Sequence, residues 1–161
     1  METVQLRFAK PEDMSSVLTL IQELAHFEKE PEAVVISEQD LVKDGFGEHS
    51  KFTCIVAEKH NAIVGMALFY PRYSTWKGPT LHLEDLIVTR SERGTGVGKA
   101  LYTAFIDYAH QHNLRRIEWV VLDWNTPAVD FYKKSGAEIL EDWRTVQMDQ
   151  DAIKRYLTNE L

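Results

Sequence analysis

The chain has 161 residues, which is enough for one well-packed domain and short for two. Hydrophobic residues make up 44% and charged residues 27%, as in an ordinary globular protein, and no apolar run approaches the ~20 residues of a membrane-spanning helix. The formal charge of −7 argues against general nucleic-acid binding and is compatible with a cationic ligand.

The N-terminus and the cysteine content predict the compartment. The opening stretch "METVQLRFAKPED" lacks the basic-then-apolar pattern of a signal peptide. The single cysteine, Cys54, has no partner for an internal disulfide, so we expect a cytoplasmic protein in which Cys54 is a buried strand residue rather than a nucleophile. The six histidines show no metal-ligand spacing, and we therefore expect no metal.

Alternation and helical periodicity predict the elements of the first third of the chain. Residues 4–9 alternate with period two and predict an opening strand, and residues 11–31 predict a helix that ends at a proline. One face of that helix is apolar and carries Met14, Val17, Leu18, Ile21, Leu24 and Ala25. A shorter helix is predicted over 37–47, with Ser37 as its N-cap and Gly45 near its end.

The middle of the chain predicts four strands and one helix. Residues 52–58 and 62–70 predict two strands joined as a hairpin. Residues 80–88 predict a strand that leads directly into a glycine-rich turn. A helix is predicted over 96–112, and residues 115–123 predict a further strand.

The last part of the chain is predicted to contain both helices and strands. Residues 126–136 predict a short helix that begins after Asn125 and ends at a glycine. Residues 137–149 predict one or two more strands, and residues 151–157 predict a final helix. Because we see no repeat, low-complexity segment or linker, we expect residues 1–161 to form a single domain.

The glycine-rich turn lies in "RSERGTGVGKAL", residues 90–101. A nucleotide-triphosphate loop would need glycine in place of Arg93 and a hydroxyl in place of Ala100, and a dinucleotide fingerprint would need glycine in place of Lys99. What remains is the pattern R-x-x-G-x-G between a strand and a helix. Its glycines allow close approach to a ligand, and the helix N-terminus favours an anion. Spacing alone leaves open both a pyrophosphate site and an ordinary strand-to-helix turn.

This pattern resembles motif A of the GNAT acetyltransferases, which hold the pyrophosphate of acetyl-CoA in such a turn. From about Leu6 to Met148, the segments "LIQELAHFE", "DLVKDGFGEH", "LEDLIV", "RGTGVGKAL" and "WNTPAVDFYKKSGA" follow one another as in the diamine, or spermidine/spermine, acetyltransferases. The resemblance implies an α/β (α+β) GNAT fold, with a central mixed, mostly antiparallel sheet of about six to seven strands and helices on both faces. It also implies a homodimer that uses acetyl-CoA as co-substrate and a small cationic amine as acceptor.

By the same resemblance, acetyl-CoA is bound by three segments of the chain. The backbone of the strand before the turn pairs with the pantetheine arm, the turn holds the pyrophosphate, and the start of the short helix lies against the cofactor. The residues are Leu86, Ile87, Val88, Arg93, Gly94, Thr95, Gly96, Val97, Gly98, Lys99, Asn125, Thr126, Pro127, Ala128 and Tyr132. The position of Asn125 alone also fits a helix cap with no other role.

Two residues are predicted to be catalytic. An aliphatic amine has a pKa of about 10 and arrives protonated, so a base must accept its proton. By resemblance, Glu84 is that base, acting through water, and Tyr132 donates a proton to the departing thiolate. In regular alternation Glu84 shares a strand face with His82 while Asp85 faces the other side, and only a bulge would bring both carboxylates to the site. The residues alone leave open a solvated strand end and a core tyrosine.

The acceptor site of a long cation requires carboxylates and aromatic faces along a groove. The resemblance assigns to it Phe27, Glu28, Glu84, Asp85, Glu118, Trp119, Val120, Asp142 and Trp143. Two departures concern the acceptor: Phe27 stands where the family has a tyrosine, and the segment 137–144 is shorter than in the polyamine enzymes. Which of Glu141 and Asp142 takes the acidic role is left open.

The predicted function is transfer of the acetyl group of acetyl-CoA to a primary amine of a diamine or polyamine, by direct attack in a ternary complex. One alternative is an N-acetyltransferase for thialysine or another small amine. Another is a non-catalytic acyl-CoA-binding sensor, which the presence of both Glu84 and Tyr132 disfavours. A protein acetyltransferase is a weaker option because the short chain offers no peptide-docking insertion. We expect no nucleic-acid or membrane partner.

Overall fold

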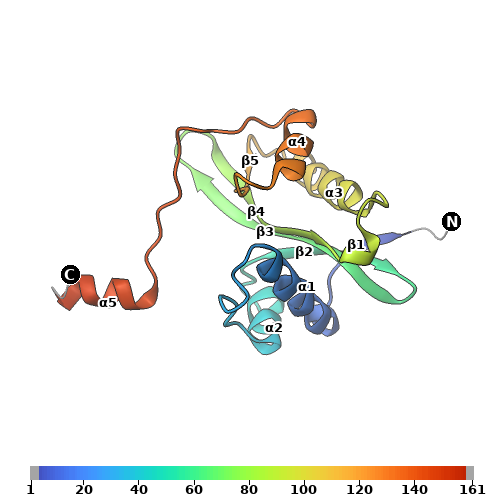
Figure 1. The fold of residues 1–161 in the computed structure, drawn as a ribbon, viewed down its shortest axis with the longest axis horizontal. Coiled ribbons are helices and arrows are strands. Elements are labelled where there is room, and N and C mark those ends of the chain that lie inside the picture. The colour runs from blue at the N-terminus through green and yellow to red at the C-terminus, as the bar shows by residue number, and fades with distance from the viewer. Residues whose placement is uncertain (1–3, 159–161) are drawn as a thin grey trace. The chain divides into compact units, whose positions relative to one another are not determined.

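Five strands form one mixed sheet in the computed structural model, which describes residues 4–158. In sheet order the strands are β1 (Gln5–Phe8), β2 (Thr53–Lys59), β3 (Ala62–Ser74), β4 (Gly78–Val88) and β5 (Ile117–Glu118) (Figure 1). The first four pair antiparallel with their neighbours, and β5 pairs parallel with β4. The predicted class, a mixed and mostly antiparallel sheet, is confirmed.

Helices cover both faces of this sheet. On one face lie α1 (Met14–Phe27) and α2 (Glu38–Phe46), and on the other lies α3 (Val97–Gln111) (Figure 1). Short 3-10 turns precede α1 and α3, at Pro11–Asp13 and Arg90–Glu92. The chain continues with α4 (Thr126–Lys134) and α5 (Gln150–Thr158).

Alternation along the strands sorts the apolar side chains into two cores. On the α3 side, Phe69 packs against Phe105, with ring centroids 5.1 Å apart. On the opposite side, Val56 and Met66 pack with Met14 of α1. All five side chains are fully buried, and burial of each contributes about 1.5–3 kcal/mol to folding. The two cores hold α1 and α3 firmly on opposite faces of the same strands.

A β-bulge interrupts the pairing of β3 with β4. The register shifts by one residue, so that Glu84 has no partner on β3. In a regular strand Leu83 and Ile87 would face the same side, because they are separated by an even number of residues. Instead Leu83 packs in the core beside α3 and Ile87 in the core beside α1. The bulge therefore reverses the alternation and turns Asp85 toward the α1 side.

The start of α2 follows the local prediction. The Asp40 amide donates to Ser37 Oγ at 3.2 Å, and the Ser37 amide donates to Asp40 Oδ2 at 2.8 Å. This reciprocal capping box satisfies amides that the first helical turn leaves without partners. It fixes where α2 begins, and hence the length of the connection from α1.

The predicted number and extent of strands near the C-terminus were wrong. The strand expected over 115–123 is limited to the two residues Ile117–Glu118, and residues 137–149 contain no strand. The sheet therefore has five strands rather than six to seven. Alternating apolar residues form a strand only where a partner supplies the other half of the ladder. Val120 and Val146 instead remain 69% and 90% exposed.

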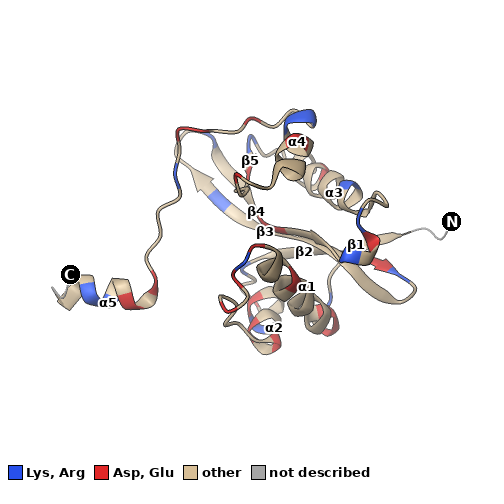
Figure 2. Cartoon of the chain, in the orientation of Figure 1, with Lys and Arg blue, Asp and Glu red and all other residues tan. Residues whose placement is uncertain are grey.

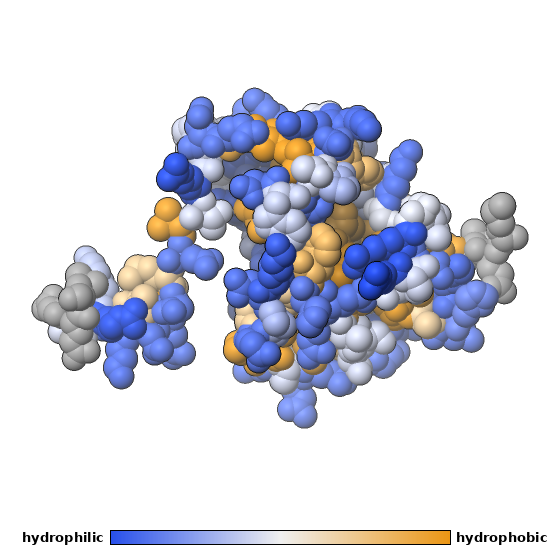
Figure 3. Space-filling model, in the orientation of Figure 1, coloured by the Kyte–Doolittle hydropathy of each residue, from blue (hydrophilic) through white to orange (hydrophobic). Residues whose placement is uncertain are grey.

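The chain divides into two compact units, one ending at Val120 and the other beginning at Val121. The first contains the sheet with α1, α2 and α3, and the second contains α4 and α5. The expected single domain stays a prediction. Hydrophilic residues dominate the visible face, with smaller apolar patches between them (Figure 3). Within residues 4–158, no helix combines the length and apolarity needed to cross a membrane.

Candidate active site

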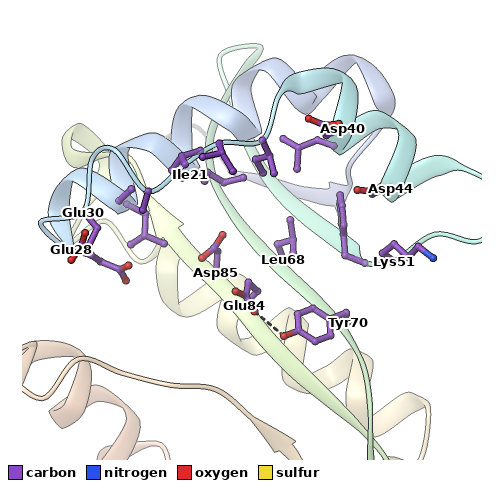
Figure 4. Close-up of a pocket in the computed structure, with 18 residues that line it drawn as sticks. Ile21, Glu28, Glu30, Asp40, Asp44, Lys51, Leu68, Tyr70, Glu84 and Asp85 are labelled. Atoms are coloured by element: carbon purple, nitrogen blue, oxygen red, sulfur yellow. Dashed lines mark hydrogen bonds between the residues drawn. The ribbon is translucent and has the colours of Figure 1, made fainter. Parts of the chain in front are cut away.

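A pocket of about 500 Å³ lies on the side of the sheet that α1 and α2 cover. Its walls come from α1, from the segment that follows α1 and from α2, and its floor comes from β3 and β4 (Figure 4). Apolar side chains line much of it, among them Ile21, Leu24, Val34, Ile36 and Phe52. The pocket has the mixture of apolar walls and a few polar groups that is typical of small-molecule sites.

Three carboxylates gather in one part of this pocket. Glu84 and Asp85 project from β4, and Glu28 stands just after the end of α1 (Figure 4). Burial, together with the charges of Glu84 and Glu28, raises the pKa of Asp85 to about 7. Burial and the charge of Glu84 also raise the pKa of Glu28. Because the three carboxylates repel one another, a bound cation would reduce the electrostatic repulsion among them.

The bulge in β4 is the reason that two of these carboxylates share the pocket. Consecutive side chains in a regular strand point to opposite faces, so one of Glu84 and Asp85 would lie beneath α3. With Glu84 as the extra residue, both line the pocket on the α1 side. The condition stated from the sequence, a bulge at this point, is met.

Tyr70 of β3 holds the Glu84 side chain. Its hydroxyl donates a hydrogen bond to Glu84 Oε2 at 2.9 Å (Figure 4). His82, directly across from Tyr70 in the sheet, has its Nε2 atom 3.6 Å from the same oxygen. Burial and the bond to Glu84 raise the pKa of Tyr70 to about 12, so the phenol remains a donor. Sequence reasoning missed Tyr70, because its contact with Glu84 depends on the register across the bulge.

The glycine turn after β4 presents open space for a ligand. Gly94 and Gly96 have φ values of +79° and +95°, a region that glycine occupies without strain. A Cβ atom at either position would meet no atom within 4 Å. α3 begins at Val97, and the first amides of a helix have no partner within it. An open cradle beside free helix amides fits a pyrophosphate group.

One edge of β4 next to the turn is also available. β5 pairs with β4 only at Leu81 and His82. For Leu86–Val88, β3 occupies one edge, and no strand within residues 4–158 pairs with the other. An extended ligand with amide groups would bind such an edge as an added strand does.

The sequence pattern of the acetyltransferase (GNAT) family matches residues 16–137. The chain belongs to this family. The fold of the chain is the GNAT fold, as the resemblance implied. Members of the family are acetyltransferases that use acetyl-CoA. The predicted acetyltransferase activity is thus confirmed, and the open cradle at Gly94 and Gly96 fits the pyrophosphate of that co-substrate.

This GNAT protein is similar along nearly its whole length to both curated proteins and solved structures. A thialysine N-epsilon-acetyltransferase of Bos taurus is 38% identical over 96% of this chain and 97% of its own length. The spermidine/spermine N(1)-acetyltransferase-like protein 1 of Homo sapiens is 30% identical over 95% of this chain, which matches 24% of that protein. A solved integron cassette protein from the mobile metagenome of V. cholerae has a TM-score of 0.79 and 25% identity, with 98% of this chain and 99% of that chain covered.

Not all predicted acceptor residues of the GNAT protein line the pocket. Glu118 forms ion pairs with Arg72 and with Arg116, the latter at 2.9 Å. Trp119 packs on the α3 side, where its ring centroid lies 5.7 Å from that of Tyr102. Phe27 lies beside the glycine turn, with the Arg93 guanidinium 5.6 Å from its ring centroid. Glu28, Glu84 and Asp85 are therefore the predicted acceptor residues that the structure brings together.

The remaining predicted residues lie in the second unit. Asn125 occupies the N-cap position of α4, and its side chain makes no capping hydrogen bond. The first turn of α4 contains Thr126, Pro127 and Ala128. Tyr132 is half-buried on the same helix, and Asp142 and Trp143 are exposed outside any helix or strand. Their roles stay predictions.

Neither a metal cluster nor a reactive thiol accompanies these groups. Among residues 4–158, no group of three or more His, Cys, Asp or Glu side chains is arranged to hold a metal ion. Cys54 is buried in β2, and burial raises the pKa of its thiol to about 12. A thiol in that state is a poor nucleophile, which agrees with the structural role expected for Cys54.

Proposed function

We propose that this acetyltransferase acetylates the primary amine at the end of an aminoalkyl chain, with thialysine as the favoured acceptor. The observation that carries the proposal is the pocket in which Glu28, Glu84 and Asp85 gather beside apolar walls. Three carboxylates attract the terminal ammonium, and the apolar walls accommodate the methylene chain. The full-length similarity to thialysine N-epsilon-acetyltransferases supports this acceptor over a polyamine.

The proton of the ammonium group passes to the carboxylate pair on β4. Bound at the pocket, the ammonium lies against Glu84, whose orientation is held by Tyr70. The raised pKa of Asp85, about 7, makes this carboxyl the better proton acceptor near neutral pH. The base predicted as Glu84 alone is therefore proposed to be the pair of Glu84 and Asp85. The neutral amine is then free to act as a nucleophile.

The glycine turn and the edge of β4 bind the co-substrate in this proposal. When bound, acetyl-CoA supplies an activated acetyl thioester for direct attack by the amine. The turn amides from Gly94 to Lys99 hold the pyrophosphate, the backbone of Leu86–Val88 holds the pantetheine arm, and Asn125 adds a polar contact. Tyr132 donates the proton that the departing thiolate requires.

A diamine or polyamine is the second candidate acceptor. Acidic residues outnumber basic ones along the end of α1, the connection and α2, where Figure 2 shows several Asp and Glu positions. Three of them besides Glu28 line the pocket, namely Glu30, Asp40 and Asp44. These carboxylates supply binding sites for a second ammonium group further along a long cation.

An amine panel tests the proposal. Thialysine, lysine, putrescine, spermidine and spermine are each assayed with saturating acetyl-CoA, and kcat/KM is compared. We expect thialysine to exceed spermidine by about tenfold or more. A higher value for spermidine would favour the polyamine acceptor. Acetyl-CoA binding in calorimetry with no turnover of any amine would instead favour the acyl-CoA sensor.

A further inference from the structure

A carboxylate on α1 is bonded to the segment that connects β4 with the glycine turn. Glu23 Oε1 accepts a hydrogen bond from the Arg90 amide at 2.9 Å and another from Arg93 Nη2 at 3.1 Å. Glu23 Oε2 accepts a hydrogen bond from Thr89 Oγ1 at 3.0 Å. One side chain thus fixes three positions of a segment that is 66 to 70 residues away in the sequence.

The Arg93 side chain makes further contacts besides the one with Glu23. Its Nε donates to the Val88 carbonyl at 2.9 Å, and its guanidinium lies 5.6 Å from the centroid of the Phe27 ring. On the other side of the turn, Lys59 Nζ binds the Glu92 carboxylate at 2.8 Å. The turn is therefore held by side chains from α1 and β2.

This arrangement matters because few backbone hydrogen bonds lie within the turn, to which the Thr95 hydroxyl adds one bond, donated to the Glu92 carbonyl at 2.6 Å. The backbone bonds within it run from Glu92 to Thr89 and from Arg93 to Arg90, and the two glycines that follow have backbone freedom. A phosphate cradle binds well only if its amides are already oriented before the ligand arrives. Glu28, which lines the acceptor pocket, directly follows the end of α1, so one helix positions both the turn and this part of the pocket.

We propose that Glu23 is a positioning residue of the acetyl-CoA site, which holds the glycine turn in its binding conformation through Thr89, Arg90 and Arg93. The inference rests on the proposed function. The proposal predicts the direction in which acetyl-CoA affinity changes when Glu23 is replaced. A negative charge beside a pyrophosphate site opposes anion binding by Coulomb repulsion, so removal of the charge would strengthen acetyl-CoA binding if charge alone mattered. If Glu23 positions the turn, its removal weakens binding.

Calorimetric titration of acetyl-CoA tests this sign. Glu23→Leu removes both acceptor oxygens, so the Arg90 amide, Arg93 and Thr89 lose their shared partner, and we expect the Kd for acetyl-CoA to rise about tenfold. The control Glu12→Gln removes one charge from an exposed side chain before α1 and should leave Kd within about twofold. In turnover assays, KM for acetyl-CoA should rise while kcat at saturation changes little.

A second variant tests whether Glu23 and Arg93 act together, and thermal unfolding confirms that each variant used in the comparison is folded. Arg93→Lys retains the positive charge but cannot bridge Glu23 and the Val88 carbonyl. The double variant should bind acetyl-CoA no more weakly than the weaker single variant, since both changes disrupt one assembly. Unchanged or tighter binding by Glu23→Leu, or additive losses in the double variant, would overturn the proposal while the proposed function stands. Absence of acetyl-CoA binding by the wild type would overturn both.

Discussion

The substitution Asp85→Asn gives the sharpest test of the acidic pocket. Burial and the charges of Glu84 and Glu28 raise the pKa of Asp85 from 3.8 to about 7. A difference of that size corresponds to about 4 kcal/mol of unfavourable interaction in the ionised state, and partial solvent access reduces it to about 2 kcal/mol. Because the pKa is higher in the folded state, the folded protein loses stability as pH rises from about 4 to about 7. Asparagine carries no charge and avoids that loss.

Urea unfolding at pH 4.5, 6 and 8 measures the effect. Relative to wild type, the free energy of unfolding of Asp85→Asn should increase by about 2 kcal/mol between pH 4.5 and pH 8. Asp123→Asn, at an exposed position, should show no such trend. An equal difference between Asp85→Asn and wild type at every pH would refute the reasoning.

The same substitution should change the pH profile of turnover. If Asp85 accepts the amine proton, kcat/KM of the wild type rises through a pH of about 7 as the carboxyl ionises. The variant should lose this part of the profile and most of its activity near neutral pH. If kcat/KM of the variant still rises through a pH of about 7, Glu84 alone accepts the amine proton.

The other predictions concern the co-substrate, the acid, the acceptor and assembly. Gly96→Val should weaken acetyl-CoA binding severely, because φ at this position is +95° and a side chain would enter the open cradle; unchanged affinity in a folded variant, measured by calorimetry, would contradict this. Tyr132→Phe should lower kcat about a hundredfold with little change in acetyl-CoA affinity or Tm, and near-normal turnover would leave solvent as the proton source. Glu28→Gln should raise KM for thialysine and for spermidine by similar factors, because Glu28 lies in the pocket proposed for the terminal ammonium, whereas a clearly larger effect on spermidine would favour the polyamine acceptor. The protein should be a homodimer in light scattering at micromolar concentration, and a monomer would count against the family expectation.

Local patterns predicted most elements of the first unit. The N-cap at Ser37, the period-two strands around Cys54 and the helix after Gly96 depend on neighbours in the sequence, and all three lie where they were expected. The strands predicted over 115–123 and 137–149 depended on a partner strand that the pattern does not contain. Alternation alone therefore overestimated the number and length of the strands in the sheet.

The sequence predicted the carboxylates of the candidate site but not the hydrogen bonds that position them. Glu28, Glu84 and Asp85 were identified by resemblance, and the structure brings them to one pocket. Tyr70 and Glu23 were not identified, because each acts through a contact between distant segments. No local periodicity encodes a hydrogen bond between a side chain and a backbone amide 67 residues apart.

The bulge in β4 has a consequence for how such a site arises. Leu83 and Asp85 pair with adjacent residues of β3, so the ladder would be continuous if Glu84 were absent from the chain. The carboxylate bonded to Tyr70 is thus additional to the sheet rather than part of its framework. Insertion of a single codon into the gene is sufficient to add it. Every neighbouring side chain would keep the face it already occupied, which makes a second acidic group accessible in one evolutionary step.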